Sequence, residues 1–153
     1  MSVGRLLPAL LVAALASVAI AGCGGETTED AYKDAFPPIN RKLVALGNQV
    51  GNSIENAGKS TNQKLADDFG GYASELGELK QQLDDLDPPD DLSSDQDALV
   101  SAMDAVQGDL SGISTAAKQG DPAAARDATT KLIRDSEKLR DGRRKLAAAV
   151  GKL

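Results

Sequence analysis

The sequence predicts an all-α fold, an antiparallel up-down-up-down four-helix bundle with coiled-coil-like packing, after a separate apolar leader. Four stretches of about 26–30 residues carry apolar residues at intervals of three and four, the period of an amphipathic helix. The breaks between them are short and contain Gly or Pro, and no stretch shows the alternation of a β-strand. Long amphipathic helices joined by short loops pack as antiparallel neighbours. A longer, more open array of the same helices is the alternative.

The first stretch, residues 28–57, is interrupted by Pro37-Pro38. Tyr32 and Phe36 precede the prolines on one helical face. Proline disfavours helix in the residue before it, so the sequence predicts a bend around 36–38. One kinked helix and a short helix followed by a longer one both fit the pattern. After the prolines the apolar residues with helical spacing are Ile39, Leu43, Leu46, Val50, Ile54 and Ala57.

The second stretch carries the most regular pattern in the chain. We expect a turn at 58–60, after which Ser60 and Gln63 have the spacing of a capping box. Pro88-Pro89 ends the helix. Its seam has the alternating intervals of a heptad repeat and consists of Leu65, Phe69, Tyr72, Leu76, Leu79, Leu83 and Leu86.

The third helix is expected to begin between Asp91 and Ser93 and to end near Lys118. Gly120 suits the position after its C-cap, where a left-handed conformation is common. Gln96 is polar where a hydrophobic residue is expected. The apolar positions are Leu92, Leu99, Met103, Val106, Leu110 and Ile113.

The fourth helix is expected to follow at once, because Asp121-Pro122 combines an N-cap residue with proline at the first helical position. Ser136 and Arg143 interrupt its seam with polar side chains. The apolar positions are Ala125, Ala128, Leu132, Leu139, Leu146, Val150 and Leu153.

The leader ends in a short motif that carries chemical information. Residues 6–21 form an apolar segment that is short for a membrane span and typical of a signal-peptide core. Ile20-Ala21-Gly22-Cys23 lies at the end of this segment and includes the only cysteine of the chain. The motif resembles the lipobox of bacterial lipoproteins. An uncleaved signal anchor and an ordinary signal with an incidental cysteine are the alternatives.

This resemblance implies that residues 1–22 are a signal peptide removed by a dedicated peptidase. It also implies that the sulfur of Cys23 carries a thioether-linked diacylglycerol, which anchors the protein to the membrane. Residues 23–28 would form a flexible stem, because Gly24 and Gly25 follow the cysteine. Residues 29–153 would then form the bundle at the extracytoplasmic face of the cell membrane.

Composition excludes several classes of function. The chain has no His and no Trp, two Tyr, two Phe and a net charge of −6, so it lacks the basic surface and the aromatic rings of nucleic-acid binders. Without His there is no Ser-His-Asp triad and no di-iron site of the ferritin type. We expect no enzymatic activity, no cofactor and no metal. Nothing in the sequence places two acidic residues at facing buried positions, which a hydrolase with paired carboxylates would need.

Charge is distributed unevenly along the chain. Residues 84–97 contain seven aspartates, without the mid-loop Gly and closing Glu of a calcium loop. Up-down-up-down topology brings this run, the mature N-terminus and the C-terminal end of the last helix to the same end of the bundle. The basic residues there are a candidate second membrane contact, although completion of the helix dipole and neutralisation of the aspartates is the simpler interpretation. They are Arg140, Arg143, Arg144, Lys145 and Lys152.

The sequence therefore favours a non-catalytic interaction or scaffold domain of the cell envelope, with an envelope protein or wall component as its partner. The alternative is a carrier that holds a small apolar ligand or lipid between the helices. An enclosed apolar cavity above about 300 Å³ would favour the carrier, and a filled core would favour the interaction domain. The run LDPPDDL and the composition also resemble small uncharacterised helical lipoproteins of high-GC Gram-positive bacteria, a resemblance that implies no activity.

Overall fold

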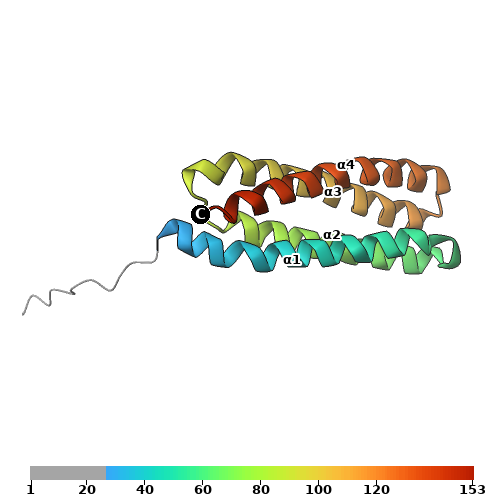
Figure 1. Cartoon of the computed structure of the whole chain (residues 1–153). Helices are drawn as coiled ribbons and strands as arrows, with labels where there is room; N and C mark the ends of the chain where they lie inside the picture. Colours follow the sequence, from blue (N-terminus) through green and yellow to red (C-terminus); the bar gives the residue numbers. More distant parts are fainter. Residues whose placement is uncertain (1–26) are drawn as a thin grey trace, which may run out of the picture.

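A computed structural model describes residues 27–153, and this part of the chain is a bundle of four antiparallel helices (Figure 1). A short 3₁₀ helix lies between the first two helices, and no strand occurs among the described residues. The all-α four-helix prediction is confirmed. The elements are α1 (Thr28–Glu55), η1 (Ala57–Lys59), α2 (Asn62–Asp84), α3 (Asp90–Gln119) and α4 (Pro122–Val150).

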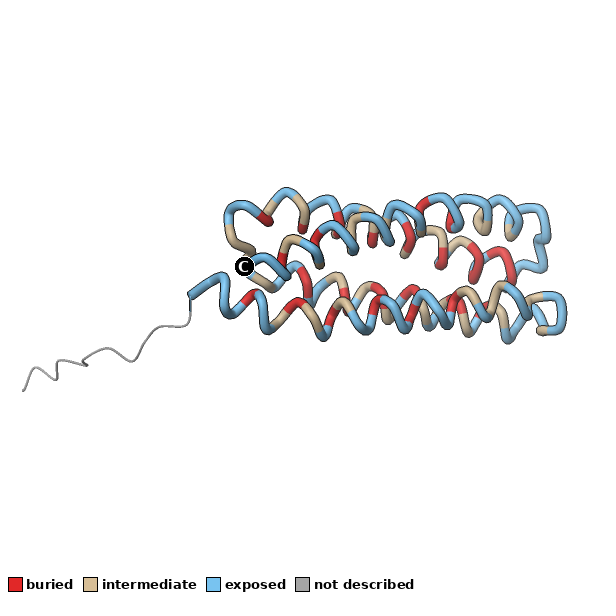
Figure 2. Tube along the Cα trace, viewed as in Figure 1, coloured by how far each residue is buried: buried red, intermediate tan, exposed pale blue. Residues whose placement is uncertain are grey.

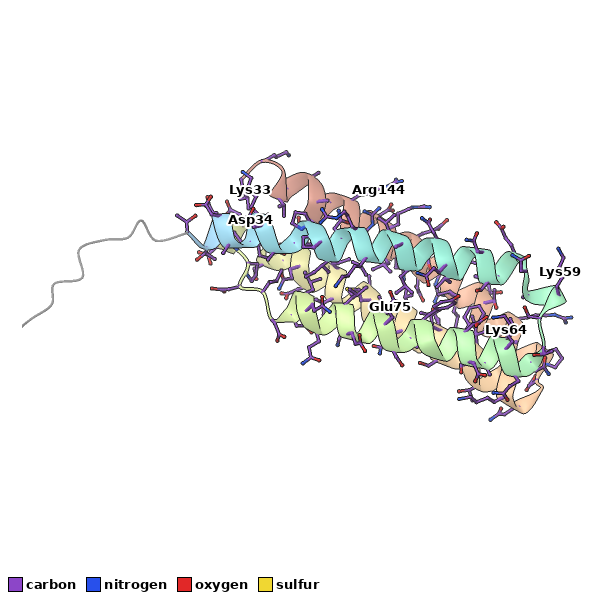
Figure 3. All side chains as sticks on the ribbon, turned by 90° about the horizontal axis from the view of Figure 1, so that it is seen from below. Lys33, Asp34, Lys59, Lys64, Glu75 and Arg144 are labelled. Carbon is purple, nitrogen blue, oxygen red and sulfur yellow. The ribbon has the colours of Figure 1, made fainter. Side chains whose placement is uncertain are left out.

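Helix α1 runs through both prolines without a break, so residues 28–55 form one helix. Pro37 and Pro38 donate no hydrogen bond to the carbonyls four residues earlier, those of Lys33 and Asp34. Both of these residues are exposed (Figure 3), so water can satisfy the two carbonyls. The helix tolerates the proline pair because the missing bonds fall on its solvent side.

The buried face of α1 at this level contains stacked aromatic rings. The ring centroids of Tyr32 and Phe36 lie 6.0 Å apart, with 5° between the ring planes. Both side chains are buried, as are the predicted core residues Ile39, Leu43 and others further along the helix. Packing on this face stabilises the helix where the prolines weaken it.

The start of α2 differs from the prediction. Thr61, not Ser60, is the N-cap, and its hydroxyl accepts a hydrogen bond of 3.1 Å from the backbone N–H of Lys64. Gln63 donates to Asp67 and does not reach back to the cap. The predicted N-cap is therefore wrong by one residue, because η1 extends the turn to Ser60, and the predicted capping box of Ser60 and Gln63 does not form.

The seam of α2 is confirmed in part. Phe69, Leu76, Leu79 and Leu83 are buried, whereas Leu65, Tyr72 and Leu86 are only partly buried. Ala66 and Ala73 are buried instead, because small side chains allow α3 to approach on that side. Ala66 accepts through its carbonyl a hydrogen bond of 2.7 Å from the hydroxyl of Ser114 on α3.

The caps at the α3–α4 connection are as predicted. Gly120 follows α3 with φ 64°, a left-handed conformation that favours glycine. Asp121 accepts from the backbone N–H groups of Ala123 and Ala124 at 3.0 Å each, and Pro122 opens α4. All six predicted apolar positions of α3 are buried.

The core lies along the axis of the bundle, where the buried positions of all four helices face one another (Figure 2). Helix α3 packs closely on α2 and α4, whereas α1 and α4 are in much looser contact. The start of α1, the α2–α3 loop and the C-terminus lie at one end (Figure 1). Among residues 27–153, none of the helices has the length and the hydrophobicity of a membrane span.

Candidate functional site: an apolar groove between α1 and α4

An apolar groove with a volume of about 320 Å³ opens along the α1–α4 interface. Its floor comes from all four helices, and its rim comes from α1 and α4. The lining residues are Leu43, Val44, Leu46, Gly47, Asn48, Val50, Leu76, Val106, Leu110, Ser136, Leu139, Arg140 and Arg143. The groove is not the enclosed cavity that would favour a carrier, and the core is not filled as expected for an interaction domain.

The polar interruptions in the seam of α4 account for this groove. Ser136 and Arg143 occupy the seam where hydrophobic side chains would fill the space opposite α1, and both line the groove. Leu139 lies between them and is only half-buried. On the opposite wall Gly47 has no side chain, and a Cβ atom built there would meet nothing within 4 Å. The seam therefore stays unfilled between α1 and α4.

The mouth of the groove is open to solvent. Val44, on its α1 rim, is 42% exposed. Below the mouth, Leu43, Leu46 and Val50 are buried at helical spacing and form the α1 side of the floor. A ligand would therefore enter from the side of the bundle and not through either end.

The charged groups of the groove are all cationic. Arg140 and Arg143 line it, and no Asp or Glu does. Nη1 of Arg143 donates a hydrogen bond of 2.8 Å to Oδ1 of Asn40, a neutral acceptor. In the described part of the chain neither arginine has a carboxylate within ion-pair distance. Burial lowers the pKa of the Arg143 guanidinium, and neighbouring Arg144 lowers it further.

The structure separates the five basic residues of the predicted cluster. Lys145 forms an ion pair of 2.7 Å with Asp95, so part of the cluster does neutralise the aspartate run. Arg143 turns into the groove, and Arg140 lies at its rim. Arg144 and Lys152 remain exposed on the outside of the bundle (Figure 3 labels Arg144). The sequence pattern alone did not reveal that two of the five face an apolar surface.

Two carboxyl groups, those of Asp109 and Asp135, lie close together at the α3–α4 interface, a proximity that the sequence pattern did not indicate. Asp135 is 6% exposed, and its carboxylate accepts hydrogen bonds from Arg134 and Lys138. Asp109 on α3 has a buried Oδ2 without a hydrogen-bond partner. Burial raises the pKa of Asp109, and the negative charge of Asp135 raises it further. The cations beside Asp135 hold its pKa well below its usual range.

This pair follows the structural pattern of an ion-pair network more closely than that of a catalytic dyad. The two carboxyl groups of a dyad share an open cleft with a substrate, whereas Asp109 and Asp135 lie outside the groove. The helical spacing places the seam of α4 at Ser136, one position after Asp135, and therefore does not indicate that Asp135 is buried. The only available signal was the run of basic residues around it at positions 134 and 138.

Gln96, the polar interruption of α3, is buried in a hydrogen-bonded contact with α1. Its Oε1 accepts a hydrogen bond of 2.6 Å from the hydroxyl of Tyr32, and its Nε2 donates to the carbonyl of Leu86 at 3.3 Å. Burial raises the pKa of Tyr32 to about 12. A shallow hollow of about 330 Å³ lies beside this contact, between the start of α1 and the α2–α3 loop.

Cys23, the lipobox and the signal peptide lie outside the described residues, as does most of the predicted stem. The aspartates of 84–97 lie in the α2–α3 loop and the flanking turns. Among residues 27–153 no cluster of three or more acidic side chains has the arrangement of a metal site.

No family of known proteins, no curated protein and no solved structure matches this chain. The fold and the groove define its class on their own: a four-helix bundle with a side-opening apolar groove whose only charged lining residues are two arginines.

Proposed function

We propose that this protein is a lipid-anchored, non-catalytic binding domain of the cell envelope, held at the outer face of the membrane by an acylated Cys23. The observation that carries the proposal is the lipobox Ile20-Ala21-Gly22-Cys23, which contains the only cysteine of the chain. It lies at the end of an apolar leader and five residues before α1 begins at Thr28. That spacing suits a short stem between a lipid and a folded domain.

An anchor of this kind holds a protein without any membrane-spanning helix. Each methylene of an acyl chain contributes about 0.8 kcal/mol on leaving water, and two chains give stable attachment where one is marginal. Attached at Cys23, the lipid would bring the start of α1, the α2–α3 loop and the C-terminus close to the membrane. The groove, about halfway along the bundle, would then face sideways above the surface.

The basic residues near that end support the anchor only weakly. Each exposed cation near an anionic membrane contributes about 1 kcal/mol. Lys145 is already paired with Asp95, and the aspartates of 84–97 reduce the field that a membrane would experience. We therefore assign the attachment to the lipid on Cys23 and not to Arg144, Lys152 or their neighbours.

Mass spectrometry of the membrane fraction tests the proposal. The natural chain should be found there without residues 1–22 and with a diacylglycerol mass on Cys23. The Cys23→Ala chain should lack this mass and leave the membrane fraction, whereas Ser17→Ala, in the leader but outside the lipobox, should behave as the natural chain does. An unmodified Cys23 in a protein released from the membrane would contradict the proposal.

A second candidate function is carriage of a small apolar ligand or lipid between the helices, and the groove favours it. Its volume of about 320 Å³ lies at the lower end of the range of roughly 300–1,000 Å³ for ligand sites. The size of the groove and the charge at its rim favour this carrier over an interaction domain that binds a partner protein.

A further inference from the structure

The groove combines an apolar floor with a cationic rim, in a chain that has 23 acidic and 17 basic residues. Eight of its thirteen lining residues are large or medium aliphatic side chains, and both charged ones are arginines. The absence of any lining acid is notable in so acidic a chain.

Arg143 is the lining residue best placed to bind an anionic group in the groove. Its guanidinium is half-buried against the apolar wall and donates to the neutral amide oxygen of Asn40. A guanidinium has five N–H donors, so most of its hydrogen-bonding capacity remains for another acceptor. A partly desolvated cation is stabilised by an anion far more than an exposed one is. Planar, bidentate recognition of carboxylate or phosphate is what arginine does best.

The size of the groove limits what can fill it. Its α1 wall runs from Leu43 to Val50 and its α4 wall from Ser136 to Arg143, about 10 Å each at the rise of an α-helix. A volume of about 320 Å³ over that length admits one extended hydrocarbon chain. An α-helix of a partner protein, with a diameter of about 10 Å, would not fit.

We propose that the α1–α4 groove binds a single-chain anionic amphiphile, with its hydrocarbon chain on the floor and its carboxylate or phosphate at Arg143 and Arg140. This inference rests on the second proposed function, carriage of an apolar ligand, and specifies the ligand's chemistry. It does not depend on the lipid at Cys23. Free fatty acids and lysophospholipids share the required chemistry.

The absence of tryptophan from the chain allows a clean binding assay. Val44→Trp places a single fluorophore at the groove mouth, at a position that is already 42% exposed. Undecanoate with a bromine in the middle of its chain is the probe, because bromine quenches tryptophan on contact and Val44 lies one helical turn beyond Asn40, the partner of Arg143. The full chain is reconstituted in phosphatidylcholine vesicles and titrated with the probe. We expect saturable quenching.

Ala105→Trp is the matched control. Ala105 is exposed on α3, outside the groove. It lies 15 residues after Asp90, and Val44 lies 16 residues after Thr28, so both reporters are about 23 Å from the same end of the bundle. Probe dissolved in the vesicle would quench both alike. We expect saturable quenching only from Val44→Trp, and equal quenching of the two reporters would overturn the proposal.

The role of the arginine is tested in the Val44→Trp background. Arg143→Gln should weaken binding about ten-fold or more, the size expected for a charge-assisted hydrogen bond, and Arg143→Lys should restore part of it. Arg144→Gln removes the same charge one position away, outside the groove, and should leave binding within about two-fold. Equal losses for Arg143→Gln and Arg144→Gln would mean that net charge alone attracts the probe, which contradicts the proposal.

The methyl ester of the same probe has the same chain without the negative charge. Comparing its binding with that of the acid tests the anionic head group separately from carriage of an apolar ligand. If the ester binds as tightly as the acid, the proposed requirement for an anionic head group is wrong, whereas carriage of an apolar ligand still holds. Absence of saturable quenching by either would overturn both. Displacement of the bromo-acid by undecanoate or by lysophosphatidylglycerol would support the proposal and identify the preferred source.

Discussion

The hydroxyl of Tyr32 on α1 donates a hydrogen bond of 2.6 Å to Oε1 of Gln96 on α3, and both side chains are buried. The bond joins two helices 64 residues apart in sequence. It lies near the end of the bundle where the chain enters α1. A polar pair in an otherwise apolar seam fixes the register of these helices, because any slip would leave both groups unpaired.

Removing one partner of this bond should therefore destabilise the fold more than removing both. Gln96→Leu leaves the Tyr32 hydroxyl and the Leu86 carbonyl without their partner, and we expect a loss of about 1–3 kcal/mol in the free energy of unfolding. Adding Tyr32→Phe should recover part of that loss. Urea denaturation of the two single variants and the double variant measures the coupling. Strictly additive losses would show that the bond contributes nothing.

Tyr32 should also make the fold sensitive to alkaline pH. Its pKa is raised to about 12 in the folded chain, against about 10 when unfolded. The neutral phenol therefore favours the folded state fully below pH 10, and this contribution is lost as the pH rises toward 12. The loss amounts to about 2–3 kcal/mol.

The corresponding measurement is stability against pH for the natural chain and two phenylalanine variants. Tyr32→Phe should remove much of the decline between pH 10 and 12, whereas Tyr72→Phe should keep it. Tyr72 is only partly buried and shares a hydrogen bond of 2.8 Å with Ser53. The same alkaline decline in both variants would assign it to other groups.

Asp109→Asn should stabilise the protein at neutral pH and have little effect in acid. The pKa of Asp109 is raised by burial and by Asp135, so its favourable contribution is present at low pH and lost as the pH rises through its folded pKa. An amide mimics the protonated acid at every pH. Thermal unfolding across this range should show an advantage that grows with pH.

Asp104→Asn is the control for that experiment. Asp104 is an exposed carboxylate on the same helix, paired with Lys80 at 2.8 Å, and its loss should be neutral or slightly destabilising at neutral pH. A stabilisation by Asp104→Asn equal to that by Asp109→Asn would reflect the reduced net negative charge alone.

The N-cap of α2 can be assigned by a pair of alanine substitutions. Thr61→Ala removes the acceptor for the N–H of Lys64 and should cost about 1 kcal/mol. Ser60→Ala should cost less, because the hydroxyl of Ser60 makes only a bond of 3.4 Å to the carbonyl of Asn56. Chemical denaturation of the two variants compares them. A larger loss from Ser60→Ala would return the cap to the position that the sequence pattern indicated.

The helices and most of the core were predictable because they follow from local periodicity. The α3 seam from Leu92 to Ile113 was correct at every apolar position. The errors occurred where neighbouring helices decide between adjacent residues. Ala66 and Ala73 replaced Leu65 and Tyr72 in the α2 core, since α3 approaches most closely on their side.

The sequence did not predict the groove. It showed only that two polar residues, Ser136 and Arg143, interrupt the apolar seam of α4. The sequence does not indicate whether another helix packs over these two residues. A polar side chain in a seam can pair across the bundle, as Gln96 does with Tyr32, or it can leave space, as Ser136 does beside Leu139. Which of the two outcomes occurs depends on the helix that faces the polar residue.

The sequence alone determined the helical segments, their caps at Gly120 and Asp121, and a cysteine motif typical of a lipid anchor, because each depends on residues within a turn or two of one another. Only the tertiary structure decided that α1 and α4 pack loosely, that Arg143 faces an apolar wall without a carboxylate, and that Asp109 meets Asp135. These features depend on the distance and rotation between helices that are far apart in the chain. Those distances are set by the packing of the whole core and not by any local pattern.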